Sequence, residues 1–215
     1  MSDFINTIDA LGDDAVMDSL IDRSITEFKD NQITSVGNNA FYGCTSLTSI
    51  NLPNVTTIDG GSFSSCSALT NVELPNLTEC VKYTGSQFAY CSALERIRLP
   101  KITSLTNQMF FQCTNLKVID TAALTTWGNG VCQACTELET IILRNTAQVA
   151  TMAALNNNIT HSKIASGTGY IYVPSSLVDS YRTATNWSTY ASQFRALEDY
   201  TVDGTVTGDL DETKI

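Results

Sequence analysis

Basic residues and histidine are scarce in this sequence. Its 215 residues include 12 Lys and Arg against 22 Asp and Glu, with a single histidine, and the formal net charge is −10. Nucleic acids and anionic membranes are bound through clustered Lys and Arg. We therefore expect neither a nucleic acid nor an anionic membrane surface as partner.

Long apolar runs are also missing. The sequence contains no stretch of eighteen apolar residues, so we expect no insertion into a bilayer. The N-terminal stretch MSDFINTIDALGDDAVMD is acidic where a secretory signal is basic, and it lacks an uninterrupted apolar region. No signal peptide is visible, and the sequence alone leaves the localisation open.

The residues needed for catalysis or metal binding do not form a recognisable motif. His161 lies in an irregular segment without a nucleophile motif nearby. Cys132 and Cys135 form a Cys-Gln-Ala-Cys pair, but no second pair with histidine stands at zinc-ligand spacing. We predict that the protein is not an enzyme and has no catalytic residue, metal site or cofactor.

What the sequence does contain is an internal repeat. The segment AFYGCTSLTSINLP at 40–53 recurs four times with small changes, and its cysteine falls at positions 44, 66, 91, 113 and 135. The steps are 22, 25, 22 and 22 residues, and the long step includes an extra segment, CVKYTGS, at 80–86. A fixed period of this size predicts a solenoid in which each repeat forms one coil.

Apolar residues of successive repeats fall into columns. From the repeated Ile onward they alternate with polar residues, which predicts a short strand with one buried face. Proline at 53, 75 and 100 is expected to end these strands. The cysteines are odd in number and five share one column, so we interpret them as free thiols that pack as small buried hydrophobes. Cys132 takes the place of the repeated Phe.

The columns also divide the chain. Residues 1–24 carry apolar positions at helical spacing and are predicted to cap the solenoid, which spans 25–174 with about five clear repeats and degenerate first and last coils. Within it, 145–168 reads as an irregular coil with a short helix near Ala150 to Leu155. Residues 175–200 are predicted to form a C-terminal helical cap that begins at Ser175 or Ser176. The acidic tail, 201–215, is interpreted as either mobile or a small hairpin about Asp203-Gly204.

The repeat resembles the BspA-like leucine-rich repeat. The segment ITSVGNNAFYGCTSLTSINLP at 33–53 matches that family's unit almost throughout, and the resemblance covers roughly 25–174. It implies an α/β repeat solenoid, a curved right-handed superhelix with short parallel strands on its concave face. Similar proteins are mostly bacterial or protist surface or secreted proteins that act in adhesion and partner binding, which suggests a bacterial cell-surface or extracellular location.

Residues between the buried strand positions should point outward from the sheet. Two acidic neighbours flank Arg98, and two flank Lys117, so those charges can satisfy one another, whereas Arg96 has no flanking acid. These outward residues form two columns across the strands, and toward the last strands the columns contain aliphatic side chains and tyrosines. The C-terminal cap could also pack on this end. The candidate ligand-binding residues on this face are Arg96, Arg98, Val118, Asp120, Ile142, Tyr170 and Tyr172.

Two hypotheses about function follow. The leading one is a non-enzymatic binding or adhesion module that presents its concave surface to a protein or glycan partner. The alternative is a structural or accessory component of a larger assembly, such as a phage or prophage tail, in which the caps and the acidic tail make the contacts. The sequence leaves the oligomeric state open.

Overall fold

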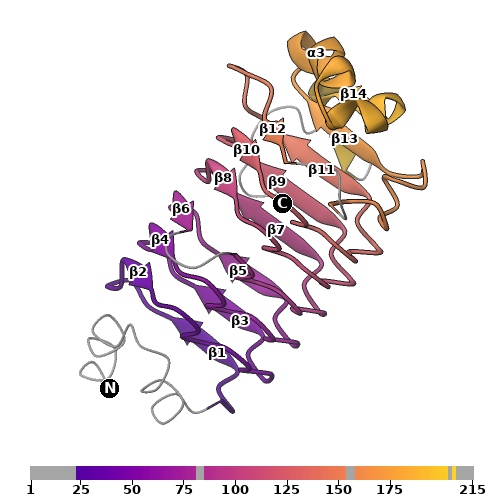
Figure 1. The fold of residues 1–215 in the computed structure, drawn as a ribbon. Coiled ribbons are helices and arrows are strands. Elements are labelled where there is room, and N and C mark those ends of the chain that lie inside the picture. Colours follow the sequence, from indigo (N-terminus) through magenta and orange to yellow (C-terminus); the bar gives the residue numbers. More distant parts are fainter. Residues whose placement is uncertain (1–22, 81–84, 154–157, 203–204, 207–215) are drawn as a thin grey trace.

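A computed structural model describes residues 23–80, 85–153, 158–202 and 205–206 of the chain. The helical cap predicted for residues 1–24 lies outside this part, except for Arg23 and Ser24. Within it the chain winds into a stack of about seven coils, each of which contributes one strand to the same side of the molecule (Figure 1). These strands are β1 (Glu27–Lys29), β3 (Ser49–Asn51), β5 (Asn71–Glu73), β7 (Arg96–Leu99), β9 (Val118–Thr121), β11 (Thr140–Leu143) and β13 (Tyr170–Val173).

Neighbouring strands run parallel, and the predicted register is confirmed at every boundary where they pair, which excludes the boundary between β5 and β7. Ser49 lies opposite Asn71, and Arg96 lies opposite Val118, as the columns require. In the first coil Phe28 lies opposite Ile50, the position that subtraction of one period gives. The strands form two sheets, β1-β3-β5 and β7-β9-β11-β13-β14, where β14 is Phe194–Ala196.

A second set of strands, each two residues long, lies on another side of the coils. The sequence predicted only that the chain returns beneath the sheet here. The strands are β2 (Ser35–Val36), β4 (Thr57–Ile58), β6 (Glu79–Cys80), β8 (Ser104–Leu105), β10 (Thr126–Trp127) and β12 (Thr151–Met152). The helix predicted near Ala150 to Leu155 is wrong at Thr151 and Met152, because these residues pair with β10 as one more coil of the stack. Residues 154–157 lie outside the described part.

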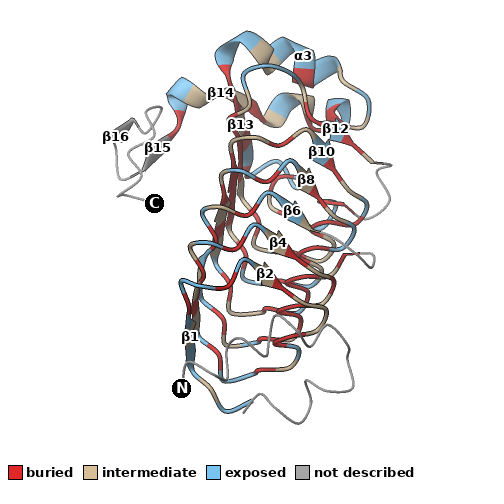
Figure 2. Cartoon of the chain, turned by 90° about the vertical axis from the view of Figure 1, so that its left-hand side faces the viewer, coloured by how far each residue is buried: buried red, intermediate tan, exposed pale blue. Residues whose placement is uncertain are grey.

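Stacked phenylalanines and buried cysteines fill the turn between the second strand of one coil and the first strand of the next. The rings of Phe41 and Phe63 lie 5.1 Å apart and nearly parallel, and Phe88 and Phe110 continue the stack. The Sγ of Cys66 donates to the carbonyl oxygen of Phe41 at 3.1 Å, a bond that recurs at Cys91, Cys113 and Cys135. The thiols are free, as predicted, and all except Cys80 are buried. Buried residues recur in the successive coils of the stack (Figure 2).

The C-terminal part combines short helices with a strand. The helices are η1 (Ser175–Leu177), α3 (Val178–Thr183), η2 (Trp187–Gln193) and η3 (Leu197–Asp199). Neither helix near Ser175 has a side-chain cap, and Phe194, which we expected at helical spacing, lies in strand β14. The predicted helical continuity is therefore wrong there, because β14 pairs with β13 and extends the sheet.

Aromatic side chains close this end of the stack. The hydroxyl of Tyr181 accepts the Ala150 backbone N–H at 2.9 Å, and the Trp187 ring N–H donates to the Ala150 carbonyl at 2.7 Å. Buried Tyr and Trp rings thus satisfy backbone groups while they cover the core.

Beyond Tyr200, β15 (Thr201–Val202) pairs antiparallel with β16 (Thr205–Val206), which matches the hairpin alternative for the start of the tail. The rest of the acidic tail, from residue 207, lies outside the described part. Among the described residues, no helix combines the length and apolar character that a membrane crossing requires.

Candidate binding surface

Side chains that point outward from β3, β5, β7, β9, β11 and β13 form one surface, which we call the strand face. The structure places all seven predicted binding residues on it: Arg96 and Arg98 on β7, Val118 and Asp120 on β9, Ile142 on β11, and Tyr170 and Tyr172 on β13. The parallel register aligns them in two rows across the sheet. Their exposure, however, differs sharply from one end to the other.

The apolar end of the strand face is covered by the chain itself. Val118 and Ile142 retain 7% and 0% of their accessible surface, since Tyr200 and Leu197 pack on them. Tyr172 belongs to the same cluster, and its ring lies 4.8 Å from that of Tyr200. Val118 and Ile142 therefore offer no surface to a partner. The C-terminal segment packs on them, which is the alternative that the sequence left open.

Asp120 is buried in a charged cluster that the sequence identified only in part. Its carboxylate accepts two bonds from Arg144, from Nε at 2.8 Å and from Nη2 at 3.0 Å. Arg98, the partner expected from the register, is farther away, with its Nε at 3.9 Å. Arg144 stands one residue after the strand, where three of the four earlier repeats have proline, and that substitution was the available signal. Its backbone N–H donates to Thr121, a bond that proline lacks.

Arg96 lies beside this cluster. Burial raises the pKa of the Tyr200 hydroxyl, and a hydrogen bond and the positive charge of Arg96 partly oppose that effect. Arg96 is therefore joined to the C-terminal segment, an interaction that the sequence did not predict because Tyr200 belongs to no repeat.

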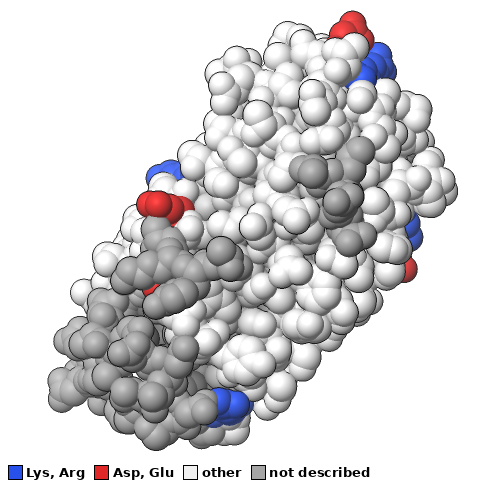
Figure 3. Space-filling model, viewed as in Figure 1, with Lys and Arg blue, Asp and Glu red and all other residues white. Residues whose placement is uncertain are grey.

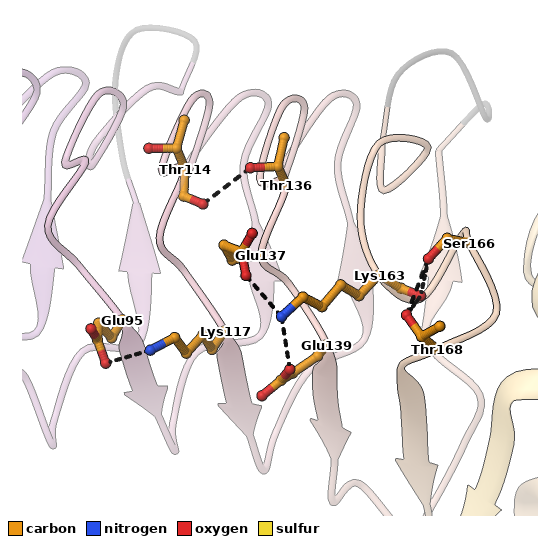
Figure 4. A network of polar contacts seen from close by, with 9 residues as sticks. All are labelled: Glu95, Thr114, Lys117, Thr136, Glu137, Glu139, Lys163, Ser166 and Thr168. Carbon is orange, nitrogen blue, oxygen red and sulfur yellow. Dashed lines mark hydrogen bonds and ion pairs between the residues drawn. The ribbon is translucent and has the colours of Figure 1, made fainter.

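Charged residues also line the strand face where its strands begin (Figure 4). Lys117 pairs with Glu95 at 3.0 Å, as the columns suggested. Glu139 is instead bound by Lys163 at 3.2 Å, and Lys163 also pairs with Glu137 at 2.8 Å. Hydrogen bonding to Glu137 and Glu139 raises the pKa of Lys163, while the pKa of Glu137 is lowered by the same contact. Lys163 was missed because it comes from the irregular coil.

Tyr170 is the most exposed aromatic residue of the strand face, with 37% of its surface accessible. The guanidinium carbon of Arg195 lies 4.4 Å from the centre of its ring, which is cation–π distance. One face of this ring is thus occupied by Arg195.

The open part of the strand face lies over β3, β5 and β7. Asn71 and Glu73 are exposed there, and Arg96 and Arg98 are partly exposed. Between β5 and β7 the surface is hollowed into an open groove of about 540 Å³. Among the described residues, few charged side chains lie on the face that Figure 3 shows.

The cysteines and the histidine do not form a site. Cys132 and Cys135 are both buried in the core, and burial raises the pKa of the Cys132 thiol well above its ordinary value. His161 is exposed, and its Nδ1 lies 3.3 Å from the hydroxyl of Thr160. Within the described ranges, no three His, Cys, Asp or Glu side chains are grouped as metal ligands would be.

Comparison with known families gives one match. The model of the BspA type leucine-rich repeat region matches residues 34–162 in six copies, which is more than half of the chain. None of the curated proteins matches the chain.

Several solved structures resemble the chain, among them two leucine-rich repeat proteins. The leucine-rich repeat protein of T. pallidum, TpLRR, has a TM-score of 0.52 and 27% identity over 56% of this chain and 60% of its own. A leucine-rich repeat protein from Bacteroides ovatus has a TM-score of 0.50 and 24% identity over 70% of this chain and 40% of its own, and it supports the fold alone. The chain thus spans about half the length of these two proteins.

Proposed function

The chain belongs to the BspA type leucine-rich repeat family, and we propose that it is a non-enzymatic binding module that holds a protein or glycan partner on the strand face. Repeat proteins of this kind offer extended surfaces built from many coils, and proteins bind partners on such surfaces without a deep cleft. The proposal includes the adhesion role at a cell surface that the resemblance to the repeat family implies.

The observation that carries the proposal is the contrast between the two ends of the strand face. The apolar end is covered by Leu197 and Tyr200, whereas the polar end over β3, β5 and β7 remains open. Arg96 and Arg98 stand partly exposed beside the open groove, where a partner can reach them. We therefore place the partner over β5 and β7.

A steric block tests this placement. Asn71 is exposed at the centre of the open end, and Asn115 is exposed on a turn between β8 and β9. The purified chain is first screened against arrays of surface proteins and glycans to obtain a binding partner. Asn71→Trp should then weaken that interaction at least tenfold, whereas Asn115→Trp should leave it within twofold. The reverse pattern would move the partner off the strand face.

A further inference from the structure

The stack of coils is interrupted at one boundary. β5 ends one sheet and β7 begins the next, and β6 and β8 are separated in the same way on the other side of the molecule. This boundary coincides with the 25-residue step between Cys66 and Cys91. Every other pair of neighbouring coils from β1 to β13 is joined by a ladder of hydrogen bonds along the strand face.

The turn side of the two coils remains joined. Phe63 donates its backbone N–H to Gln87 at 2.8 Å, and Ser65 donates to Ala89 at 2.7 Å. The ring of Phe63 stacks on that of Phe88 at 5.3 Å. The coils are therefore in contact at the turns and separated at their strands, which opens the groove between β5 and β7.

The interruption leaves a backbone acceptor in this groove. At regular boundaries the carbonyl before a strand accepts one or two N–H groups from the next coil: Thr26 accepts from Thr48, Thr48 accepts from Thr70 and Asn71, and Glu95 accepts from Lys117 and Val118. Among the described residues, the equivalent bonds from β7 to the Thr70 carbonyl are not formed. Thr70 lines the groove, so its carbonyl can accept an N–H group from a ligand.

Two arginines supply donors on the opposite wall. Arg96 and Arg98 alternate along β7, so their side chains leave the same face about 7 Å apart. The ion pair that the structure gives Arg98 is a 3.9 Å contact with Asp120, whose carboxylate Arg144 already binds at 2.8 and 3.0 Å. Arg98 thus keeps guanidinium donors for a ligand carboxylate, which an arginine binds with two parallel bonds.

We propose that this groove binds an extended acidic peptide segment, whose carboxylate is held by Arg98 beside Arg96 and whose backbone N–H reaches the Thr70 carbonyl. The inference rests on the proposed function and names the class of partner. Glu73, which accepts a hydrogen bond from the side-chain amide of Asn51, places a negative charge on the β5 wall. We therefore expect the carboxylate of the peptide on the β7 wall. The apolar lining comes from Val72, Leu74, Pro75 and Pro100, without an aromatic ring for a sugar to stack on, and this favours a peptide over a glycan.

The proposal is tested by measuring the affinity of a labelled peptide that alternates Glu and Ala, by fluorescence anisotropy at low salt. The control peptide has the same sequence with Gln in place of Glu. Binding of the Glu peptide should weaken at least tenfold in Arg98→Gln and at least tenfold with the Gln peptide. The matched control is Lys101→Gln, which removes one positive charge from the same coil but lies at the β6–β8 boundary. It should change the affinity less than twofold. Thermal unfolding of each variant checks that the fold is kept.

The outcomes separate this inference from the proposed function. Equal weakening by Arg98→Gln and Lys101→Gln would reduce the interaction to general charge attraction and overturn the groove as its site. Binding of polygalacturonate in preference to the peptide would overturn the peptide class. If Asn71→Trp blocks the partner from the array while the Glu peptide shows no binding, the acidic-peptide inference fails and the proposed function stands.

Discussion

The buried ion pair between Asp120 and Arg144 can be tested by a double-mutant cycle. The side chains retain 1% and 5% of their accessible surface, and they are joined by two hydrogen bonds. Loss of Asp120 leaves the buried charge of Arg144 without its carboxylate, and loss of Arg144 leaves Asp120 with only the 3.9 Å contact to Arg98. Asp120→Val and Arg144→Met should therefore each lower the free energy of unfolding by about 3 to 5 kcal/mol.

The double variant should cost much less than the sum of the two single changes. Ile142 is the neighbour of Asp120 in its outward row, so an aliphatic side chain suits this position. Buried pairs that are replaced by apolar residues of similar volume are often neutral in stability. We expect the double variant to lie within about 2 kcal/mol of the parent protein.

Urea unfolding at pH 7, followed by tryptophan fluorescence, measures each corner of the cycle. Trp127 and Trp187 are both buried and their rings lie 5.7 Å apart, so they report on the coils that hold the pair. Arg98→Met is the control, because Arg98 lies 3.9 Å from Asp120 and should contribute less than about 1 kcal/mol. Costs that simply add in the double variant would refute the reasoning.

Three further predictions concern the core. Leu116→Ala should cost about 2 to 5 kcal/mol in urea unfolding because the side chain is fully buried, whereas Asn51→Ala should cost less than about 0.5 kcal/mol; equal costs would contradict the assignment of inward and outward positions. Cys113→Ala should cost about 1 to 2 kcal/mol, since it removes the bond to the Phe88 carbonyl and leaves a small cavity, and an unchanged midpoint would mean that the bond contributes nothing. Burial raises the pKa of the Cys66 thiol from 9.0 to about 12, so the stability that its neutral form contributes is complete below pH 9 and is lost as the pH rises toward 12. The urea midpoint should fall over that range, with a shallower slope in Cys66→Ala; parallel slopes would show that this thiol does not contribute.

The solenoid itself was predictable because its period is set by packing. Each apolar column of the sequence corresponds to one layer of the core, and a one-residue error in register would move an entire buried column to the surface. Arithmetic on the repeat therefore gave the strand pairing of Phe28 with Ile50 and of Arg96 with Val118. The predicted family is confirmed by the match over residues 34–162.

The backbone of the turns carried almost no signal. The residue before each repeated cysteine has a positive φ in all five repeats, from 56° to 71°. Only Gly43 is of a residue type that favours this conformation. Its equivalents are Ser65, Tyr90, Gln112 and Ala134. The backbone N–H groups of Gly43, Ser65, Tyr90 and Gln112 donate to carbonyls of the next coil, and these bonds favour the left-handed backbone. Local residue preference therefore does not reveal the turn.

The candidate surface was predictable in position but not in exposure. The columns place Val118, Asp120 and Ile142 on the outward side of the sheet, where they lie. What buries them comes from outside the repeat: Tyr200 and Leu197 from the C-terminal segment, and Arg144 from a proline position. Periodicity describes which way a side chain points, but it does not describe what lies against it.

The interrupted boundary shows which part of the repeat holds the coils in register. Three additional residues between Cys66 and Cys91 are enough to separate β5 from β7 and β6 from β8. The same step leaves the stacking of Phe63 on Phe88 and the bond from the Cys91 Sγ to Phe63 in place. The strand ladder is a row of directional bonds that a small displacement breaks, whereas a ring stack tolerates it. We infer that the Phe and Cys positions fix the stacking of the coils, which leaves the strands free to separate where the groove forms.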